Sequence, residues 1–269
     1  MRLLAVADLH YSLPKYDWLL ATASKYDLVV IAGDHLDLTS GVDFRAQAVV
    51  VRKYLDRLKA QVPVLTCSGN HDLDSRNAEG EKIARWVRDL TADGVPADGT
   101  SFVLDDTFFT ICPWWDGPIE REAIARQLAT DSPKREGRRW IWIHHAPPID
   151  SPTSWGGQRS FGDQELSDWI REYAPDIVLA GHVHQSPFVP DGSWVDWIGD
   201  TWIFNAGHQY GAPPSCIILD TDQNAAVWLS AAGAQEVSLD QPLVRPIPPL
   251  TSLPVWLTSS DPAPGPIPA

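Results

Sequence analysis

The chain opens with Leu3-Leu-Ala-Val-Ala-Asp8-Leu-His10, an apolar run that ends in two potential metal ligands. Runs this apolar are typical of strands that are covered on both faces. Four later runs end in the same way: Val29-Val-Ile-Ala-Gly33-Asp34-His35-Leu36-Asp37, Leu65-Thr-Cys-Ser-Gly69-Asn70-His71-Asp72, Trp140-Ile-Trp-Ile-His144-His145 and Ile177-Val-Leu-Ala-Gly181-His182-Val183-His184. The pattern predicts strands over residues 3–7, 28–32, 62–67, 140–143 and 177–180.

Amphipathic segments separate these runs. Their periodicity predicts helices over residues 16–25, 44–60, 81–90, 120–128 and 164–172, and in the second helix we expect Val49, Leu55 and Leu58 to face inward. Alternation of strand and helix is typical of βαβ units in an α/β fold. After Gly181, strand-like runs over 187–189, 201–204, 215–220 and 225–229 follow one another with turns between them. We therefore expect a second, more antiparallel sheet packed on the first.

The last 29 residues differ in composition from the rest of the chain. Nine of them are proline, which is excluded from helix interiors and central strands. We therefore place one domain over residues 1–240 and an extended Pro-rich tail over 241–269. Within the tail, Trp256 and Leu257 are candidates to pack on the body or on a neighbouring subunit, and a disordered tail is the alternative.

Charge and cysteine content narrow the class of protein. The formal net charge is −14, and the one basic island, residues 132–139, is short, which argues against long nucleic acid as a substrate. The three cysteines, Cys67, Cys112 and Cys216, are isolated from one another, which favours reduced thiols. No apolar run approaches the ~20 residues of a membrane span. We expect a soluble cytoplasmic protein without a membrane partner.

The polar strand ends predict a metal site. In open α/β sheets the ligand crevice lies at the carboxyl ends of the strands, so the five runs would deliver their donors to one rim. Seven of the eight histidines lie in these five segments, and the eighth, His208, follows another strand-like run. If Asp34 bridges two ions, seven residues supply four contacts to each, which leaves positions open for water and substrate. These seven are Asp8, His10, Asp34, Asn70, His144, His182 and His184.

The motifs DxH, GDxxD, GNHD, HH and GHxH, in this order, resemble those of the calcineurin-like metallophosphoesterases over about residues 1–220. The resemblance implies a metallophosphoesterase-type β-sandwich, with two mixed sheets flanked by helices, as the catalytic domain over residues 1–240. It also implies a dinuclear centre between strand ends, in which a hydroxide bridging two divalent metals attacks phosphorus. The mixed nitrogen and oxygen donors suit Mn²⁺, Fe or Zn²⁺.

Roles carried over by motif follow from this resemblance. His71 matches the histidine that donates a proton to the leaving oxygen, and Asp72 would orient it. The HH pattern assigns the ligand to His144, so that His145 packs or contacts substrate. One metal would then be bound by Asp8, His10, Asp34 and His184, and the other by Asp34, Asn70, His144 and His182.

Further polar and aromatic residues are candidates around this site. Asp37 is expected to hold a ligand or its loop by hydrogen bonds. Arg159 could clamp a phosphate or be an exposed loop residue, and His208 could face the cleft or serve its loop. Three loop tryptophans, Trp114, Trp115 and Trp155, could stack a nucleobase, although packing is the usual role of tryptophan.

The function expected from these features is hydrolysis of small or cyclic phosphodiesters. Protein phosphatases of this superfamily carry arginines in GDxxDRG and RGNHE, whereas this chain has Leu38 and Ser68 at the corresponding positions. The sequence is more similar to the bacterial cyclic-nucleotide and small-phosphodiesterase branch. Alternatives are a phosphomonoesterase or nucleotidase with the same site, a nuclease, which the acidic charge disfavours, and a non-catalytic binding scaffold. The partner would be a small phosphoester, and a homo-oligomer is compatible with the sequence.

Overall fold

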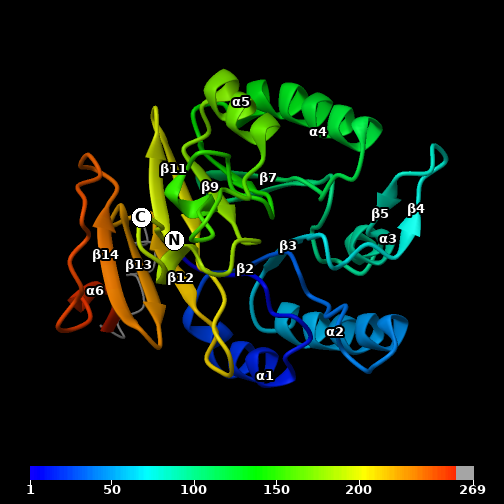
Figure 1. Ribbon diagram of the computed structural model, residues 1–269, viewed down its shortest axis with the longest axis horizontal. Helices are drawn as coiled ribbons and strands as arrows, with labels where there is room; N and C mark the ends of the chain where they lie inside the picture. The colour runs from blue at the N-terminus through cyan, green and yellow to red at the C-terminus, as the bar shows by residue number, and fades with distance from the viewer. Residues whose placement is uncertain (259–269) are drawn as a thin grey trace, which may run out of the picture.

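Two six-stranded sheets of mixed strand direction pack face to face in the structure, a computed structural model that describes residues 1–258 (Figure 1). The first sheet has the order β14-β13-β12-β1-β2-β3. Its strands β1, β2 and β3 run parallel, while β12, β13 and β14 pair antiparallel. The strand bounds are β1 (Arg2–Val6), β2 (Leu28–Ala32), β3 (Val64–Cys67), β12 (Cys216–Asp220), β13 (Ala225–Ser230) and β14 (Gly233–Ser238).

The second sheet has the order β10-β11-β9-β8-β7-β6. Four central strands, β7, β8, β9 and β11, run parallel, and an antiparallel strand closes each edge. The strand bounds are β6 (Ser101–Leu104), β7 (Thr107–Ile111), β8 (Arg139–Ile143), β9 (Ile177–Ala180), β10 (Val195–Ile198) and β11 (Thr201–Asn205).

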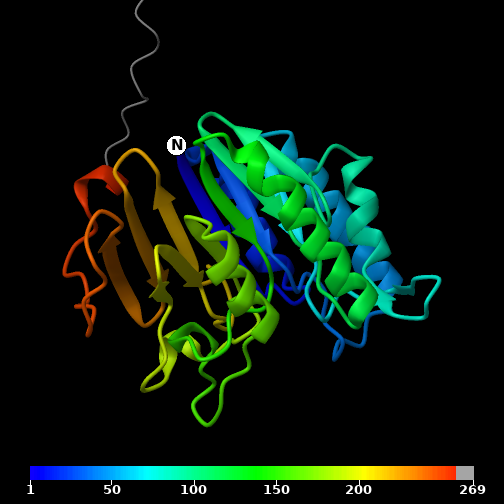
Figure 2. The same ribbon diagram turned by 90° about the horizontal axis from the view of Figure 1, so that it is seen from above.

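Helices cover the outer face of each sheet, so that the molecule has four layers (Figures 1 and 2). The first sheet is covered by α1 (Leu13–Thr22), α2 (Phe44–Lys59) and the short α3 (Arg85–Arg88). The second is covered by α4 (Pro118–Asp131) and α5 (Gln164–Tyr173). A small hairpin, β4 (Ser75–Arg76) and β5 (Lys82–Ile83), precedes α3.

Alternating side chains of one strand explain why the predicted strands are apolar throughout. Leu3 and Ala5 of β1 belong to the core between the two sheets, whereas Leu4 and Val6 belong to the core under α1 and α2. Successive side chains of a strand point to opposite faces, and here both faces are dry. The predicted β-sandwich of two mixed sheets flanked by helices is thus confirmed.

Several local predictions differ from the structure. The late strands do not form a sheet of their own, because β10 and β11 extend β9 while β12 pairs with β1. Residues 187–189 begin no strand, and a 3-10 turn occupies Ser186–Phe188. Over 81–90 a strand and a four-residue helix replace the expected helix.

In α2 the buried face carries Val51, and Val49 is 54% exposed because it is out of phase with Leu55 and Leu58.

The described part of the Pro-rich segment lies against the first sheet. The amide of Leu250 donates to the Ala234 carbonyl over 2.8 Å, and Trp256 Nε1 donates to Glu236 Oε1 over 2.7 Å. One helical turn, α6 (Val255–Thr258), forms where no helix was expected. The rest of the predicted tail, residues 259–269, lies outside the described residues. Within the described range, no helix combines the length and apolar character that a membrane crossing requires.

Candidate metal centre

Strand ends from both sheets meet at one rim. Glycine is required there because the loops approach closely: a Cβ on Gly69 would lie 2.1 Å from Asp34 Oδ1, and one on Gly181 would lie 2.5 Å from the Ala7 Cβ. The backbone is also left-handed at Asp8 and His182, with φ of 55° and 68°. Such φ values are unfavourable for side chains with a Cβ and recur at functional sites, where the surrounding fold holds them.

A first group of donors lies beside the end of β1. One donor atom from each of four residues lies within 4.8 Å of the others. His184 Nε2 is 3.1 Å from Asp8 Oδ1 and 3.0 Å from His10 Nε2. His10 Nε2 is 3.8 Å from a carboxylate oxygen of Asp8 and of Asp34. Two carboxylates and two imidazoles at these separations fit a divalent cation. The four residues are Asp8, His10, Asp34 and His184.

A second group lies on the other side of Asp34. His145 Nε2 is 3.2 Å from Asp34 Oδ2, and His182 Nδ1 is 2.9 Å from Asn70 Oδ1. The rings of His145 and His182 have centroids 5.2 Å apart. His145 Nε2 is buried and makes no hydrogen bond to any described residue, while its Nδ1 lies 2.7 Å from the Ala32 carbonyl. A histidine fixed through one nitrogen by a carbonyl, with the other nitrogen aimed at a carboxylate, has the environment of a metal ligand.

The structure places His144, the expected ligand, away from both groups of donors. His144 Nε2 lies 3.5 Å from Asp163 Oδ2, next to α5, and His145 takes the position beside Asp34. Consecutive residues at a strand end point to opposite faces, so only one of the two histidines can reach the centre. His145 is the one that lies beside Asp34.

Electrostatics support a cation at this position. Burial alone would raise the pKa of Asp34, but His145 beside it holds that pKa well below its usual value. Burial would lower the pKa of His145, yet the carboxylates of Asp34 and Asp8 raise it to about 9. Two buried carboxylates thus attract a proton to His145. Metal ligands must release their protons to bind, so a divalent ion and this proton compete for the same place.

Among the described residues, Asp72, which was predicted to orient His71, makes its hydrogen bonds to backbone amides and not to the His71 ring. Asp72 is buried and accepts hydrogen bonds from the backbone amides of His35 at 3.0 Å, Leu36 at 3.1 Å and Gly69 at 2.9 Å. The His71 ring packs edge-on against His10, with centroids 4.7 Å apart, and its buried Nδ1 has no hydrogen-bond partner among residues 1–258. Asp72 therefore joins the loops that follow β2 and β3.

The remaining candidates lie at different distances from the centre. Asp37 accepts from the Thr39 amide and hydroxyl, so it stabilises its own turn. The Arg159 guanidinium lies 4.6 Å from the centroid of the Phe161 ring, in a loop outside both donor groups. His208 touches the centre: its ring stacks on His184 with centroids 4.7 Å apart, and its Nδ1 lies 2.6 Å from the Asp8 carbonyl.

Sequence reasoning missed Lys15. Its side chain is 2% exposed, its Nζ lies 3.2 Å from His208 Nδ1, and burial lowers its pKa to about 8. No motif marks this lysine, because it lies in α1 and reaches the rim only through the packing of that helix. The approach of Trp114 to the His182 ring, with centroids 5.2 Å apart, also has no sequence signal beyond its place in a loop.

One protein family and several solved structures match this chain. A family model described as calcineurin-like phosphoesterase matches residues 1–186. No curated protein matches the chain. Among solved structures, TT1561 of Thermus thermophilus is 13% identical, with a TM-score of 0.56 over 88% of this chain and 98% of that chain.

Two further solved structures share the fold. A purple acid phosphatase from yellow lupin (Lupinus luteus) seeds is 15% identical, with a TM-score of 0.54 over 91% of this chain and 52% of that one. A dimetal phosphatase from Danio rerio is 12% identical, with a TM-score of 0.51 over 85% of this chain and 95% of that one. At these identities the similarity establishes the fold alone.

Proposed function

Since the chain belongs to the calcineurin-like phosphoesterase family and is a metal-dependent phosphoric ester hydrolase, we propose that it hydrolyses small or cyclic phosphodiesters. The observation that carries the proposal is the convergence of oxygen and nitrogen donors from both sheets around Asp34. Asp34 lies between the two groups and is the natural bridging ligand. The first ion would be held by Asp8, His10, Asp34 and His184, and the second by Asp34, Asn70, His145 and His182.

Two divalent ions bound there would supply Lewis acidity to the phosphoryl oxygens and lower the pKa of a bound water. The chain's own residues have the tasks of holding the donors and moving a proton. His71 projects beside His10 at the rim, with its backbone amide fixed by a 2.9 Å hydrogen bond to Asp34 Oδ1. We assign His71 the transfer of a proton to the leaving oxygen, a task that imidazole performs well near neutral pH.

Charge around the centre favours a diester over a monoester. A phosphomonoester dianion carries one more negative charge than a diester and calls for added cationic contacts. Among the described residues, Lys15 is the lysine that hydrogen-bonds at the rim, and its Nζ is already directed at His208. The carboxylates of Asp163 and Glu165 lie on the other side of His182, where they line a pocket. This arrangement supports a substrate with a single negative charge on phosphorus.

The proposal is tested by the ratio of kcat/KM for bis(4-nitrophenyl) phosphate to that for 4-nitrophenyl phosphate in Mn²⁺. A ratio well above one that is lost with Asp34→Asn supports a diesterase. A ratio well below one would contradict it and identify a monoesterase that uses the same centre.

A further inference from the structure

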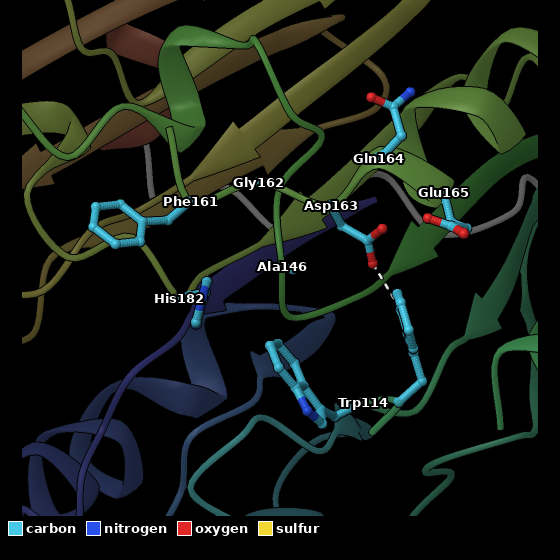
Figure 3. Close-up of a pocket in the computed structure, with 9 residues that line it drawn as sticks. Trp114, Ala146, Phe161, Gly162, Asp163, Gln164, Glu165 and His182 are labelled. Carbon is cyan, nitrogen blue, oxygen red and sulfur yellow. Dashed lines mark hydrogen bonds between the residues drawn. The ribbon is translucent and has the colours of Figure 1, made fainter. Parts of the chain in front are cut away.

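An aromatic pocket opens directly beside the second donor group (Figure 3). It encloses about 360 Å³ and shares His182 with the centre. Trp114 and Phe161 both line it, with the Trp114 ring directed toward His182 in Figure 3, and Asp163 lies at the start of α5. A phosphoester whose phosphate sits at the centre can direct one of its organic groups past His182. The pocket is an open space on that side of the centre.

The walls of the pocket are rings held in fixed orientations. Trp115 Nε1 donates to Asp163 Oδ2 over 2.7 Å, and the same carboxylate caps α5 through the Leu166 amide. The Trp114 ring is tilted by 48° on the His182 ring. Each ring therefore presents a face or an edge without further rearrangement. Preorganised aromatic walls suit a planar ligand, because stacking loses little side-chain entropy.

Phe161 forms the outer wall and is the most exposed of these rings. It is 42% exposed in a loop whose fold places it there: its amide donates to the Ser154 carbonyl over 2.9 Å. A Cβ on Gly156 would lie 2.5 Å from the Phe161 ring, so the loop needs glycine at that position. Phe161 is thus a partly exposed ring at the edge of an open pocket, where it can contact a bound ligand.

We propose that this pocket binds a planar, uncharged aromatic group of the substrate, of the kind that a nucleobase supplies. The assignment rests on the proposed function, since it names the organic group of the phosphodiester cleaved at the centre. Trp114, Trp115 and Phe161 would stack on the ring, and carboxylate oxygens at the α5 end would accept from its amino or imino groups. Trp155 has no part in this, because its Nε1 donates to the Pro190 carbonyl away from the pocket.

A quaternary ammonium group is the main rival, since aromatic cages also bind cations. However, two of the aromatic rings that line the pocket already have a guanidinium group close to them. Arg121 lies 5.8 Å from the Trp115 ring centroid and Arg159 lies 4.6 Å from that of Phe161, and neither lines the pocket. A third cation between those rings would be repelled by both guanidinium groups but attracted by the carboxylates of Asp163 and Glu165, so this rival needs a direct test. A second phosphate is also disfavoured, because Asp163 and Glu165 face the space.

Three diesters that share the 4-nitrophenolate leaving group distinguish between these classes of ligand. They are the thymidine 5′, methyl and choline esters of 4-nitrophenyl phosphate. The scissile bond is the same in all three, so differences in kcat/KM report the retained group. We expect the thymidine ester to exceed the methyl ester by about tenfold or more, as stacking of one base on aromatic side chains implies. Equal values, or the highest value for the choline ester, would overturn the assignment.

Variants of Phe161 test whether the preference for the thymidine ester depends on the pocket. Phe161→Ala should lower the thymidine-to-methyl ratio by about fivefold or more, and Phe161→Tyr should restore it, since either ring can stack. Trp197→Ala is the matched control, because Trp197 is an exposed tryptophan on β10 outside the pocket. A ratio that is unchanged in Phe161→Ala would contradict the role of this wall.

The methyl ester distinguishes failure of the proposed function from failure of the pocket assignment. If none of the three esters is hydrolysed in Mn²⁺, the diesterase proposal fails. The pocket assignment is then tested by ligand binding alone. Adenosine, titrated into the full-length protein and followed by NMR of its ring protons, should then bind wild type more tightly than Phe161→Ala. Equal affinity for the two proteins would overturn the pocket assignment.

Discussion

His145 Nε2 lies 3.2 Å from Asp34 Oδ2, whereas the adjacent His144 faces Asp163 at the start of α5. On the basis of this contact we propose His145, and not His144, as the ligand. Because the Ala32 carbonyl fixes the other nitrogen of His145, the ring cannot turn away without losing a buried hydrogen bond. Asp34 thus stands between one group of donors that includes His10 and another that includes His145.

His71→Ala tests proton transfer to the leaving group. Loss of a general acid typically costs about 10²–10⁴-fold when the leaving group is a poor one, and little when it is already stable as an anion. We expect a large loss of kcat/KM for alkyl diesters and a small loss for 4-nitrophenyl diesters. Equal losses for both kinds of substrate would contradict the assigned role.

Asp72→Ala tests the structural role that the hydrogen bonds indicate. It would leave three buried amides, those of His35, Leu36 and Gly69, without their acceptor. We expect the free energy of unfolding to fall by about 3 kcal/mol or more, with a smaller loss for Asp72→Asn, which keeps an acceptor oxygen. Urea denaturation measures both variants.

The same variants distinguish that role from orientation of His71. If Asp72→Ala kept wild-type stability and lost activity only on alkyl diesters, Asp72 would act through the His71 imidazole after all. The hydrogen bonds in the structure predict the opposite pattern.

Much of this architecture follows from local sequence pattern. The strands that lead into the centre are continuous apolar runs, and a glycine before the polar residue marks three of the turns. Those signals alone place Asp8, Asp34 and His182 at strand ends, before it is known which strands pair with one another. The helices α1, α2, α4 and α5 also correspond to periodic segments.

Other features depend on contacts between distant segments. His144 and His145 follow the same run, and only the packing of β8 against α5 decides which one faces the centre. Strand pairing after Gly181 is equally non-local, since β12 returns to pair with β1 across the whole chain. The pocket wall formed by Trp115 depends on Asp163, which is 48 residues away.

Asp98 provides a pH-dependent test of the buried network behind the centre. It accepts from the Ser68 amide and hydroxyl, and Ser68 in turn accepts from the Trp114 amide. Burial raises the pKa of Asp98 from 3.8 to about 6. The folded protein therefore holds this proton at pH values where the unfolded chain has released it, and its stability falls as pH rises through that window.

Asp98→Asn removes this titration. The free energy of unfolding of the variant, minus that of wild type, should rise by about 1 kcal/mol between about pH 5 and pH 7 and level off above that. Taking the difference cancels pH effects common to both proteins, including those of metal binding. A difference that does not change with pH would show that Asp98 titrates normally.

The central claim is that Asp34 joins two groups of donors, with His145 and not His144 in the second. The most direct test is the stoichiometry of Mn²⁺ per chain, measured for wild type, His145→Ala and His144→Ala after equilibrium dialysis. We predict two ions for wild type and for His144→Ala, and loss of one ion for His145→Ala. Loss of an ion from His144→Ala with full occupancy in His145→Ala would contradict the account.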